Sequence, residues 1–132
     1  MLGRNSYAKS YIDACRAKTA AQIAAFKAIG PQPGFEQLFL EAMVLELDQF
    51  FVHRLRMMEG KDGNPLNEVR MLCNAIMLGD GVLQTDNTIK YKPEKAVLGL
   101  AIGAPVRLDV KGFEALAKAF FDDIAAKYAQ GG

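Results

Sequence analysis

Residues 35–59 read FEQLFLEAMVLELDQFFVHRLRMME, and this stretch decides the predicted fold. It contains no glycine or proline and is long enough for about seven helical turns. At a repeat of 3.6 residues, apolar side chains fill about half of the circumference, and an arc that wide needs more than one packing partner. The opposite face also carries Leu38, Leu45 and Val52, so it is only half polar. We therefore predict one long helix over 35–59 as the centre of a helical domain.

A second helix is predicted on the N-terminal side of this stretch, over residues 6–29. It follows Asn5 and Ser6, which are both good N-cap residues, and it ends before Gly30 and Pro31. Apolar residues recur along it at a spacing of three and four, which is typical of one buried helical face.

A third helix is predicted on the C-terminal side, over residues 65–78. Asn64 is a suitable N-cap, and Pro65 fits the first helical position, where its missing N–H is not needed. The loop before this helix is short. We therefore expect the helices over 35–59 and 65–78 to fold back on each other.

The last part of the chain predicts a short β element and a final helix. Residues 79–93 show no periodicity, whereas 96–108 (AVLGLAIGAPVRL) place apolar residues around a Gly-Ala-Pro turn and indicate a small β-hairpin. Asp109 is the expected N-cap of a helix over 110–129. The predicted fold is thus mainly α: a four-helix bundle-like single domain, residues 1–132, with a small β-hairpin before the last helix.

The composition argues against several classes of partner. Sixteen Lys and Arg residues offset fifteen Asp and Glu residues, and a net charge of +1 gives no global field to attract nucleic acid or an anionic membrane. The chain is 51% hydrophobic, but no apolar run approaches the roughly 18 to 20 residues of a membrane span. The first ten residues lack the apolar segment of a secretion signal. Cys15 and Cys73 lie in apolar helical patterns, so we expect free core thiols in a reducing cytoplasm.

Several kinds of site lack their required residues. A single histidine cannot form a multi-histidine metal centre, and the sequence has no dinucleotide or phosphate loop and no nucleophile elbow. The stretch GKDGNPLNE lacks the central glycine that a calcium loop requires. We therefore expect no metal and no cofactor.

The one histidine, His53, is the main candidate for acid–base chemistry. On the predicted helix it shares a flank with Glu46, Gln49 and Arg56, so Glu46 could orient it and Arg56 could hold an anionic substrate. A second interpretation needs no ligand. Basic residues near a helix C-terminus complement the helix dipole by roughly 0.3 to 1 kcal/mol, and this alone explains their position. We favour the second interpretation and lean against an enzyme.

The loop EGKDGNP, residues 59–65, suggests a site for a small anion. It presents the free N–H groups of the following helix close to Arg56, Lys61, Asn64 and Arg70. The alternative is that Asn64 caps this helix while Asp62 and Glu68 supply the negative charge that complements the dipole. The sequence leaves both interpretations open and favours capping.

Methionine is concentrated in the two predicted helices that flank this loop. Methionine fills irregular gaps in a core and also occurs on surfaces that bind several partners, so the group indicates either core packing or an apolar interface. Five of the six methionines belong to this group: Met43, Met57, Met58, Met71 and Met77.

Three segments resemble parts of small uncharacterised bacterial helical proteins of unknown function. They are LDQFFVHRLR (47–56), GKDGNPLNEVRMLCNAIM (60–77) and EKAVLGLAIG (94–103), and the resemblance extends over most of the chain from residue 35 onward. It implies a bacterial, cytoplasmic, single-domain protein. It implies no activity.

Two functional hypotheses follow. The first is a non-enzymatic cytosolic domain that associates with itself or with another protein through the excess apolar surface of residues 35–59. The second is a protein or enzyme that binds a small anionic ligand at the corner around His53, with Arg56, Lys61, Asn64 and Arg70.

Overall fold

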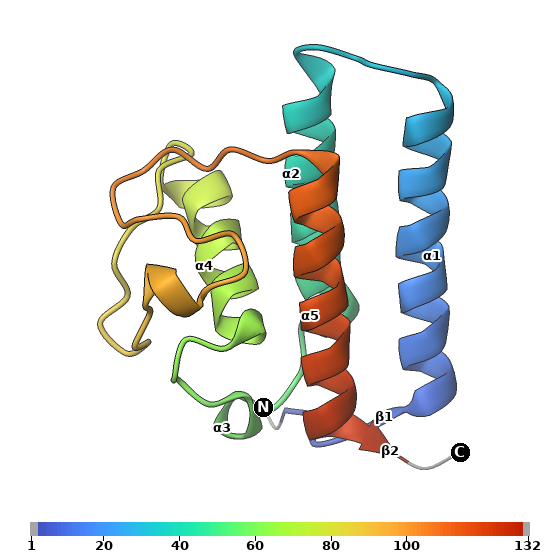
Figure 1. The fold of residues 1–132 in the computed structure, drawn as a ribbon. Coiled ribbons are helices and arrows are strands. Elements are labelled where there is room, and N and C mark those ends of the chain that lie inside the picture. Colours follow the sequence, from blue (N-terminus) through green and yellow to red (C-terminus); the bar gives the residue numbers. More distant parts are fainter. Residues whose placement is uncertain (1–2, 131–132) are drawn as a thin grey trace.

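The computed structural model describes residues 3–130 and shows a mainly helical, bundle-like protein, which confirms the predicted fold class (Figure 1). The long helices are α1 (Lys9–Ala28), α2 (Phe35–Phe50), α4 (Pro65–Leu78) and α5 (Val110–Tyr128). The short elements are the helix α3 (Arg56–Glu59), the 3₁₀ turn η1 (Pro93–Lys95), and the strands β1 (Tyr7–Ala8) and β2 (Ala129–Gln130).

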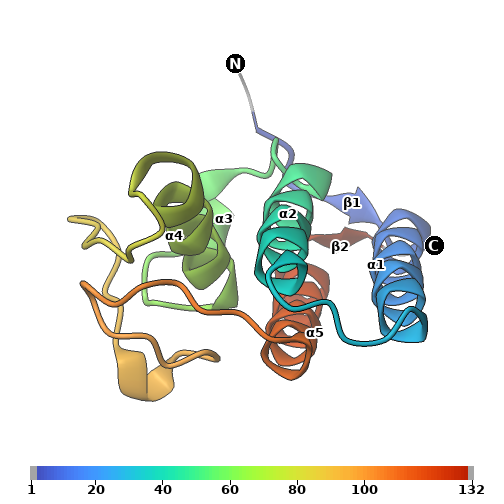
Figure 2. The ribbon, with the colours of Figure 1, turned by 90° about the horizontal axis from the view of Figure 1, so that it is seen from above.

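Helix α5 is the element on which the other long helices pack. It contacts α1, α2 and α4, and α2 also packs against α4. Figure 2 shows this arrangement from above, with α4, α2 and α1 in a row and α5 beside them. The central position of α5 follows from its apolar stripe, in which Phe113, Leu116, Phe120 and Ile124 are fully buried.

The two ends of the described chain lie side by side at one end of the bundle. β1 and β2 form a two-stranded parallel sheet, with Tyr7 paired to Ala129 and Ala8 paired to Gln130. A second contact of the N-terminal segment is an isolated parallel bridge between Arg4 and Arg54. The N-terminal segment is therefore fixed to two distant parts of the chain.

The single helix predicted over 35–59 is wrong in its second half. Helix α2 ends at Phe50, because Phe51 leaves the helical conformation (φ −129°, ψ 33°) and a new helix, α3, begins only at Arg56. The intervening turn bonds to the N-terminal segment instead: the Arg4 N–H donates to the His53 carbonyl, and the Leu55 N–H donates to the Arg4 carbonyl, both at 2.7 Å. The sequence of 35–59 alone could not reveal a partner 50 residues away.

The β-hairpin predicted over 96–108 is not formed. This segment is irregular, and its nearest strand-like feature is a bridge between Val82 and Pro105. Around this bridge, backbone groups of Gly103, Ala104 and Val106 bond to the backbone of residues 81–83. Other backbone groups of the segment bond to side chains of the helices. Glu68 accepts from two N–H groups of the segment, and Gln37 bonds to two further backbone groups. The irregular course predicted for 79–93 is present, apart from its final residue, which begins η1.

Two of the predicted N-caps are confirmed, those of α4 and α5. α4 covers residues 65–78 as predicted, and the Asn64 side chain accepts from the Asn67 N–H at 3.0 Å. Asp109 likewise caps α5 by accepting from the Gly112 N–H at 2.7 Å. α5 ends one residue earlier than predicted, at Tyr128.

The N-cap predicted for α1 at Asn5 and Ser6 is wrong. α1 begins three residues later than predicted, at Lys9, and ends one residue earlier, at Ala28. Its N-cap position is Ala8, which has no side chain that could accept from the helix. Residues 7 and 8 instead form β1, which pairs with β2 at the other end of the chain.

Two further properties bear on the predicted class of protein. Among the helices between residues 3 and 130, none is both long enough and apolar enough to cross a membrane. Cys15 is buried, Cys73 is half-buried, and both are free thiols as expected.

Candidate functional site

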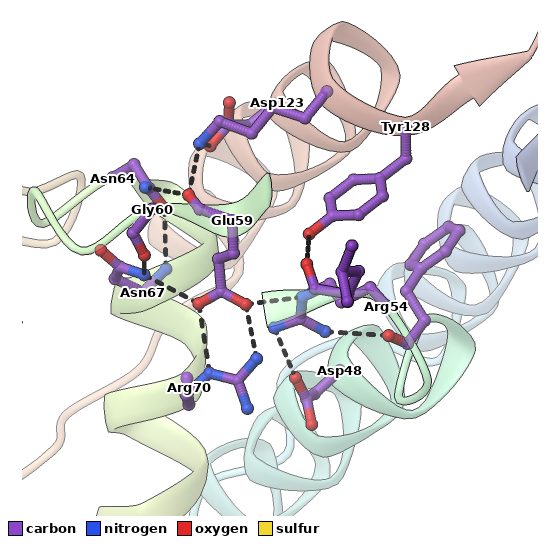
Figure 3. Close-up of polar contacts among 12 residues, drawn as sticks. Asp48, Arg54, Glu59, Gly60, Asn64, Asn67, Arg70, Asp123 and Tyr128 are labelled. Carbon is purple, nitrogen blue, oxygen red and sulfur yellow. Dashed lines mark hydrogen bonds and ion pairs between the residues drawn. The ribbon is translucent and has the colours of Figure 1, made fainter. Parts of the chain in front are cut away.

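The corner between α2 and α4 is organised around the buried side chain of Glu59 (Figure 3). Its carboxylate accepts from Arg54 Nε at 2.9 Å, from Arg70 Nε at 3.1 Å and from Asn67 Nδ2 at 2.7 Å. Only 2% of Glu59 is exposed. Burial would raise the pKa of Glu59, but the hydrogen bonds and charges of Arg70, Arg54 and Asn67 outweigh it and hold that pKa below the usual range.

Arg54 links this carboxylate to the end of α2. Its guanidinium forms an ion pair with Asp48 at 3.0 Å and donates to the Phe51 carbonyl at 3.1 Å, while only 3% of the residue is exposed. Two arginines, Arg54 and Arg70, thus meet two carboxylates, Asp48 and Glu59. The charges of this buried cluster cancel within the chain, as buried charges must.

The predicted anion-binding residues are only partly free for a ligand. Arg70 is occupied by Glu59, and Asn64 both caps α4 and donates to the Glu59 carbonyl at 2.7 Å. Arg56 and Lys61 are exposed, and they border a hollow of about 40 Å³. A hollow of that size holds a few water molecules rather than a metabolite. The geometry supports the capping interpretation, and anion binding here stays a prediction that rests on Arg56 and Lys61.

Glu68 has a different role from the dipole partner expected of it. It is buried, and its two carboxylate oxygens accept from the Val97 and Leu98 N–H groups at 2.8 and 2.9 Å. Burial raises the pKa of Glu68, although these two N–H groups act in the opposite direction. The residue anchors the irregular segment that the sequence had indicated as a hairpin.

The structure does not bring His53 and Glu46 together. Because α2 ends at Phe50, His53 lies exposed in the following turn and no longer shares a helical face with Glu46. Glu46 instead faces α1, where the Gln22 amide donates to it at 3.4 Å. The interpretation of His53 as an acid or base oriented by Glu46 therefore has no geometric basis.

His53 instead borders a groove between the N-terminal segment and the end of α2. The groove has a volume of about 470 Å³, and besides His53 its walls include Arg4, Tyr7, Tyr11 and Gln49. Sequence patterns did not identify these N-terminal residues as part of a site. The first eleven positions hold two basic residues and two tyrosines, but nothing in them indicates contact with residue 53.

The outward side of α2 presents an apolar stripe to solvent. Phe35 is 50% exposed and Leu38 is 62% exposed, Ala42 is also exposed, and Leu45 is half-buried. Together with the exposed Gln49 these residues follow one another at intervals of three, four, three and four. We call these five residues the outer stripe. That alternation is the spacing of positions that face a partner helix in a coiled coil.

The methionines serve both of the purposes that the sequence left open. Met43 and Met71 are buried in the core and Met58 is half-buried. Met57 and Met77 are 87% and 65% exposed. The group is therefore divided between core packing and surface rather than forming one pocket.

The two thiols are poor nucleophiles. Burial raises the pKa of Cys73 to about 12 and also raises the pKa of Cys15. Both side chains therefore stay protonated near neutral pH. Over residues 3–130, no group of three or more His, Cys, Asp or Glu side chains is placed to hold a metal ion.

Comparison with known proteins returns no matching family model, no matching curated protein and no matching solved structure. The class of protein is thus defined by its own features: a mainly helical bundle with a neutral buried charge cluster, an aromatic groove and an exposed apolar stripe.

Proposed function

We propose that this chain is a non-enzymatic helical domain that acts by self-association, with the outer stripe of α2 packing against the same stripe of a second copy. The observation that carries the proposal is the three-four spacing of the outer stripe along α2, in which Phe35, Leu38 and Ala42 are exposed and Leu45 is half-buried. An exposed face of this kind is not needed for the fold, because α2 already buries Leu40, Val44 and Leu47 on its inner side. Exposed apolar surface with regular spacing is typical of an interface.

The small side chain at the centre of the stripe supports helix-to-helix contact. Ala42 lies between Leu38 and Leu45, so two copies of α2 can approach closely there while the leucines of each fill the spaces beside it. A symmetric pair of this kind uses the same surface on both copies and closes as a dimer.

The acidic side chains that flank the stripe are the main obstacle, because two copies of α2 would bring like charges together. Glu41, Glu46 and Asp48 occupy these flanking positions. Each is already engaged within its own chain, by Gln37, Gln22 and Arg54 respectively. Of the three, Asp48 is paired with a cation, whereas Gln37 and Gln22 are neutral and leave the charges of Glu41 and Glu46 uncompensated. Self-association should therefore strengthen with salt, which screens this repulsion.

Light scattering over a wide concentration range tests the proposal. We expect the mass of the wild type to rise from that of a monomer towards that of a dimer, and we expect Leu38→Glu and Leu45→Glu to remain monomeric. Met57→Glu is the matched control, because Met57 is 87% exposed and lies outside the stripe. A wild type that stays monomeric at every concentration, or a Met57→Glu variant that dissociates as readily as Leu38→Glu, contradicts it.

The cytoplasmic, bacterial setting implied by the sequence resemblance belongs to this proposal. In a second version of this proposal, a helix of another protein packs on the outer stripe in place of a second copy. The alternative function, a small anionic ligand at the α2–α4 corner, has weaker support because Arg70 and Asn64 are engaged within the chain.

A further inference from the structure

We propose that the groove between the N-terminal segment and the end of α2 binds a small aromatic carboxylate, with the carboxylate on Arg4 and the ring against Tyr11. This inference concerns a ligand site and does not rest on self-association, although Gln49 belongs both to the outer stripe and to the wall of the groove. It rests on three features of the groove: a fixed frame, a cation without an ion pair among residues 3–130, and an exposed aromatic ring.

The frame of the groove is fixed by backbone bonds. The N–H and the carbonyl of Arg4 bond to the His53 carbonyl and the Leu55 N–H, both at 2.7 Å. The N-terminal segment approaches Leu55 closely at Gly3, since a Cβ at Gly3 would lie 2.8 Å from the Leu55 Cα. Position 3 therefore needs glycine. Arg4 and His53 are held beside each other before any ligand arrives, which reduces the cost of ordering them on binding.

The charge in the groove is positive. The Arg4 guanidinium lies 4.9 Å from the centre of the Tyr7 ring, and over residues 3–130 it forms no ion pair. The residues that line the groove include no aspartate or glutamate. A guanidinium in that setting offers paired N–H donors that match the geometry of a carboxylate.

The aromatic wall is rigid and partly open. Tyr7 and Tyr11 stack with their ring centres 5.8 Å apart and their planes 21° apart. The Tyr11 hydroxyl donates to the Phe50 carbonyl at 2.6 Å, and this bond fixes the ring while 42% of the residue stays exposed. A flat ligand ring can extend this stack, because aromatic rings favour offset-stacked neighbours.

The size and polarity of the groove fit such a ligand. Its volume of about 470 Å³ lies within the roughly 300 to 1,000 Å³ of small-molecule sites. An inorganic anion would leave Tyr11 uncovered, and a neutral ring would leave Arg4 unpaired. A ligand with one ring and one carboxylate satisfies both, while the exposed Gln49 and His53 side chains border the groove and supply further polar groups.

Titration of the full chain with 4-hydroxybenzoate, followed by amide chemical shifts in NMR, tests the site. We expect saturable shifts confined to residues 4–11 and 49–55. Acetate and 4-hydroxybenzamide serve as comparison compounds, one without the ring and one without the charge. Each should bind at least about tenfold more weakly, since a tenfold change corresponds to the loss of about 1.4 kcal/mol.

Two variants separate the two halves of the proposed ligand. Arg4→Gln should weaken 4-hydroxybenzoate binding at least about tenfold and leave the backbone pairing intact, because that pairing uses main-chain atoms only. Tyr11→Leu should weaken it as well, whereas the matched control Arg107→Gln changes an exposed arginine outside the groove and should have no effect.

Equal binding of acetate, shifts spread over the whole surface, or an unchanged affinity in Arg4→Gln would overturn the proposal. Unchanged amide shifts in α4 and α5 confirm that each variant is folded.

Discussion

At the scale of single residues, the buried charges decide how the corner of the molecule responds to substitution. Arg54 and Glu59 are 3% and 2% exposed, so each depends on the other for compensation. The net contribution of such a pair to folding is small, because the cost of removing two charges from water offsets their attraction. Removal of one partner is different, since it leaves an uncompensated charge in the interior.

We therefore expect Glu59→Gln to destabilise the fold by about 3 to 5 kcal/mol, as measured by urea denaturation. The substitution keeps the shape of the side chain but leaves Arg54 and Arg70 with Asp48 as their only carboxylate in the cluster. Glu94→Gln is the control, because Glu94 is exposed and most surface changes stay within about 0.5 kcal/mol. Similar small losses for both variants would show that the cluster does not depend on the charge of Glu59.

The pH dependence of stability should report the same carboxylate. Because the pKa of Glu59 is lower in the folded chain than its usual value of 4.5, the ionised form favours folding. Its contribution is fully present above pH 4.5 and is lost as the pH falls through the lowered pKa. The difference in unfolding free energy between wild type and Glu59→Gln should therefore shrink below about pH 4.5. A difference that stays constant down to pH 2 would contradict this assignment.

Two buried tyrosines give a second contrast at this scale. The Tyr128 hydroxyl donates to the Leu55 carbonyl at 2.7 Å, whereas the buried Tyr7 hydroxyl has no partner among the described residues. Tyr128→Phe should cost about 1 kcal/mol by removing this hydrogen bond, while the Leu55 carbonyl keeps its bond from the Met58 N–H at 3.2 Å. Tyr7→Phe should be neutral or slightly stabilising, because it removes an unsatisfied polar group. Thermal and urea unfolding of both variants measure this, and an equal cost for Tyr7→Phe would indicate a bound water on its hydroxyl.

At the scale of elements, helix α4 depends on a cap with several bonds. Asn64 accepts from the Asn67 N–H, and its own amide donates to the Glu59 carbonyl and to the Asp62 side chain. Asn64→Ala should cost roughly 1 to 2 kcal/mol in chemical denaturation, in line with the loss of an N-cap. Asn87→Ala changes an exposed loop residue and should cost under about 0.5 kcal/mol. Equal small losses would mean that the α4 cap contributes little.

The distance in sequence between interacting residues explains which elements could be predicted. α4 and α5 begin where Asn64 and Asp109 predict, because a cap and its helix are neighbours in the sequence. The break after α2 depends on Arg4, and the absence of a hairpin depends on Glu68 and on Gln37. These partners are far away in the sequence, so no local pattern carries their effect.

The candidate sites divide in the same way. The helical repeat alone predicted that Leu38 and Leu45 share an apolar second face of α2, because the face of a residue depends only on its position in the helix. The groove was not visible, because it joins Arg4 and Tyr11 to residues about 40 positions away. Sequence periodicity identified a surface within one element but not a site assembled from two.

At the scale of the whole molecule, the described chain combines a helical bundle with a long irregular segment over 79–109 that includes only one short 3₁₀ turn. Side chains of the helices hold this segment. Glu68 accepts from the Val97 and Leu98 N–H groups, and Gln37 bonds to the Val106 carbonyl and the Leu108 N–H. The segment also contributes Leu83, Val106 and Leu108 to the buried core, whereas Val97 is 37% exposed and Leu98 is half-buried. We therefore expect the part around Val97 to open locally without unfolding of the helices.

Amide hydrogen exchange tests whether Glu68 is such a local anchor. In Glu68→Ala the Val97 and Leu98 N–H groups lose their acceptors, so their opening free energy should fall by about 1 to 3 kcal/mol and their exchange should accelerate roughly five- to hundredfold. Gln37→Ala is the matched control, because it should accelerate exchange at Leu108 and leave Val97 unchanged. Amides of α1, which packs mainly on α5, report global unfolding in both variants. If α1 accelerates as much as Val97 does in Glu68→Ala, the segment and the bundle unfold together, and the irregular segment is an integral part of the cooperative core rather than a layer attached to it.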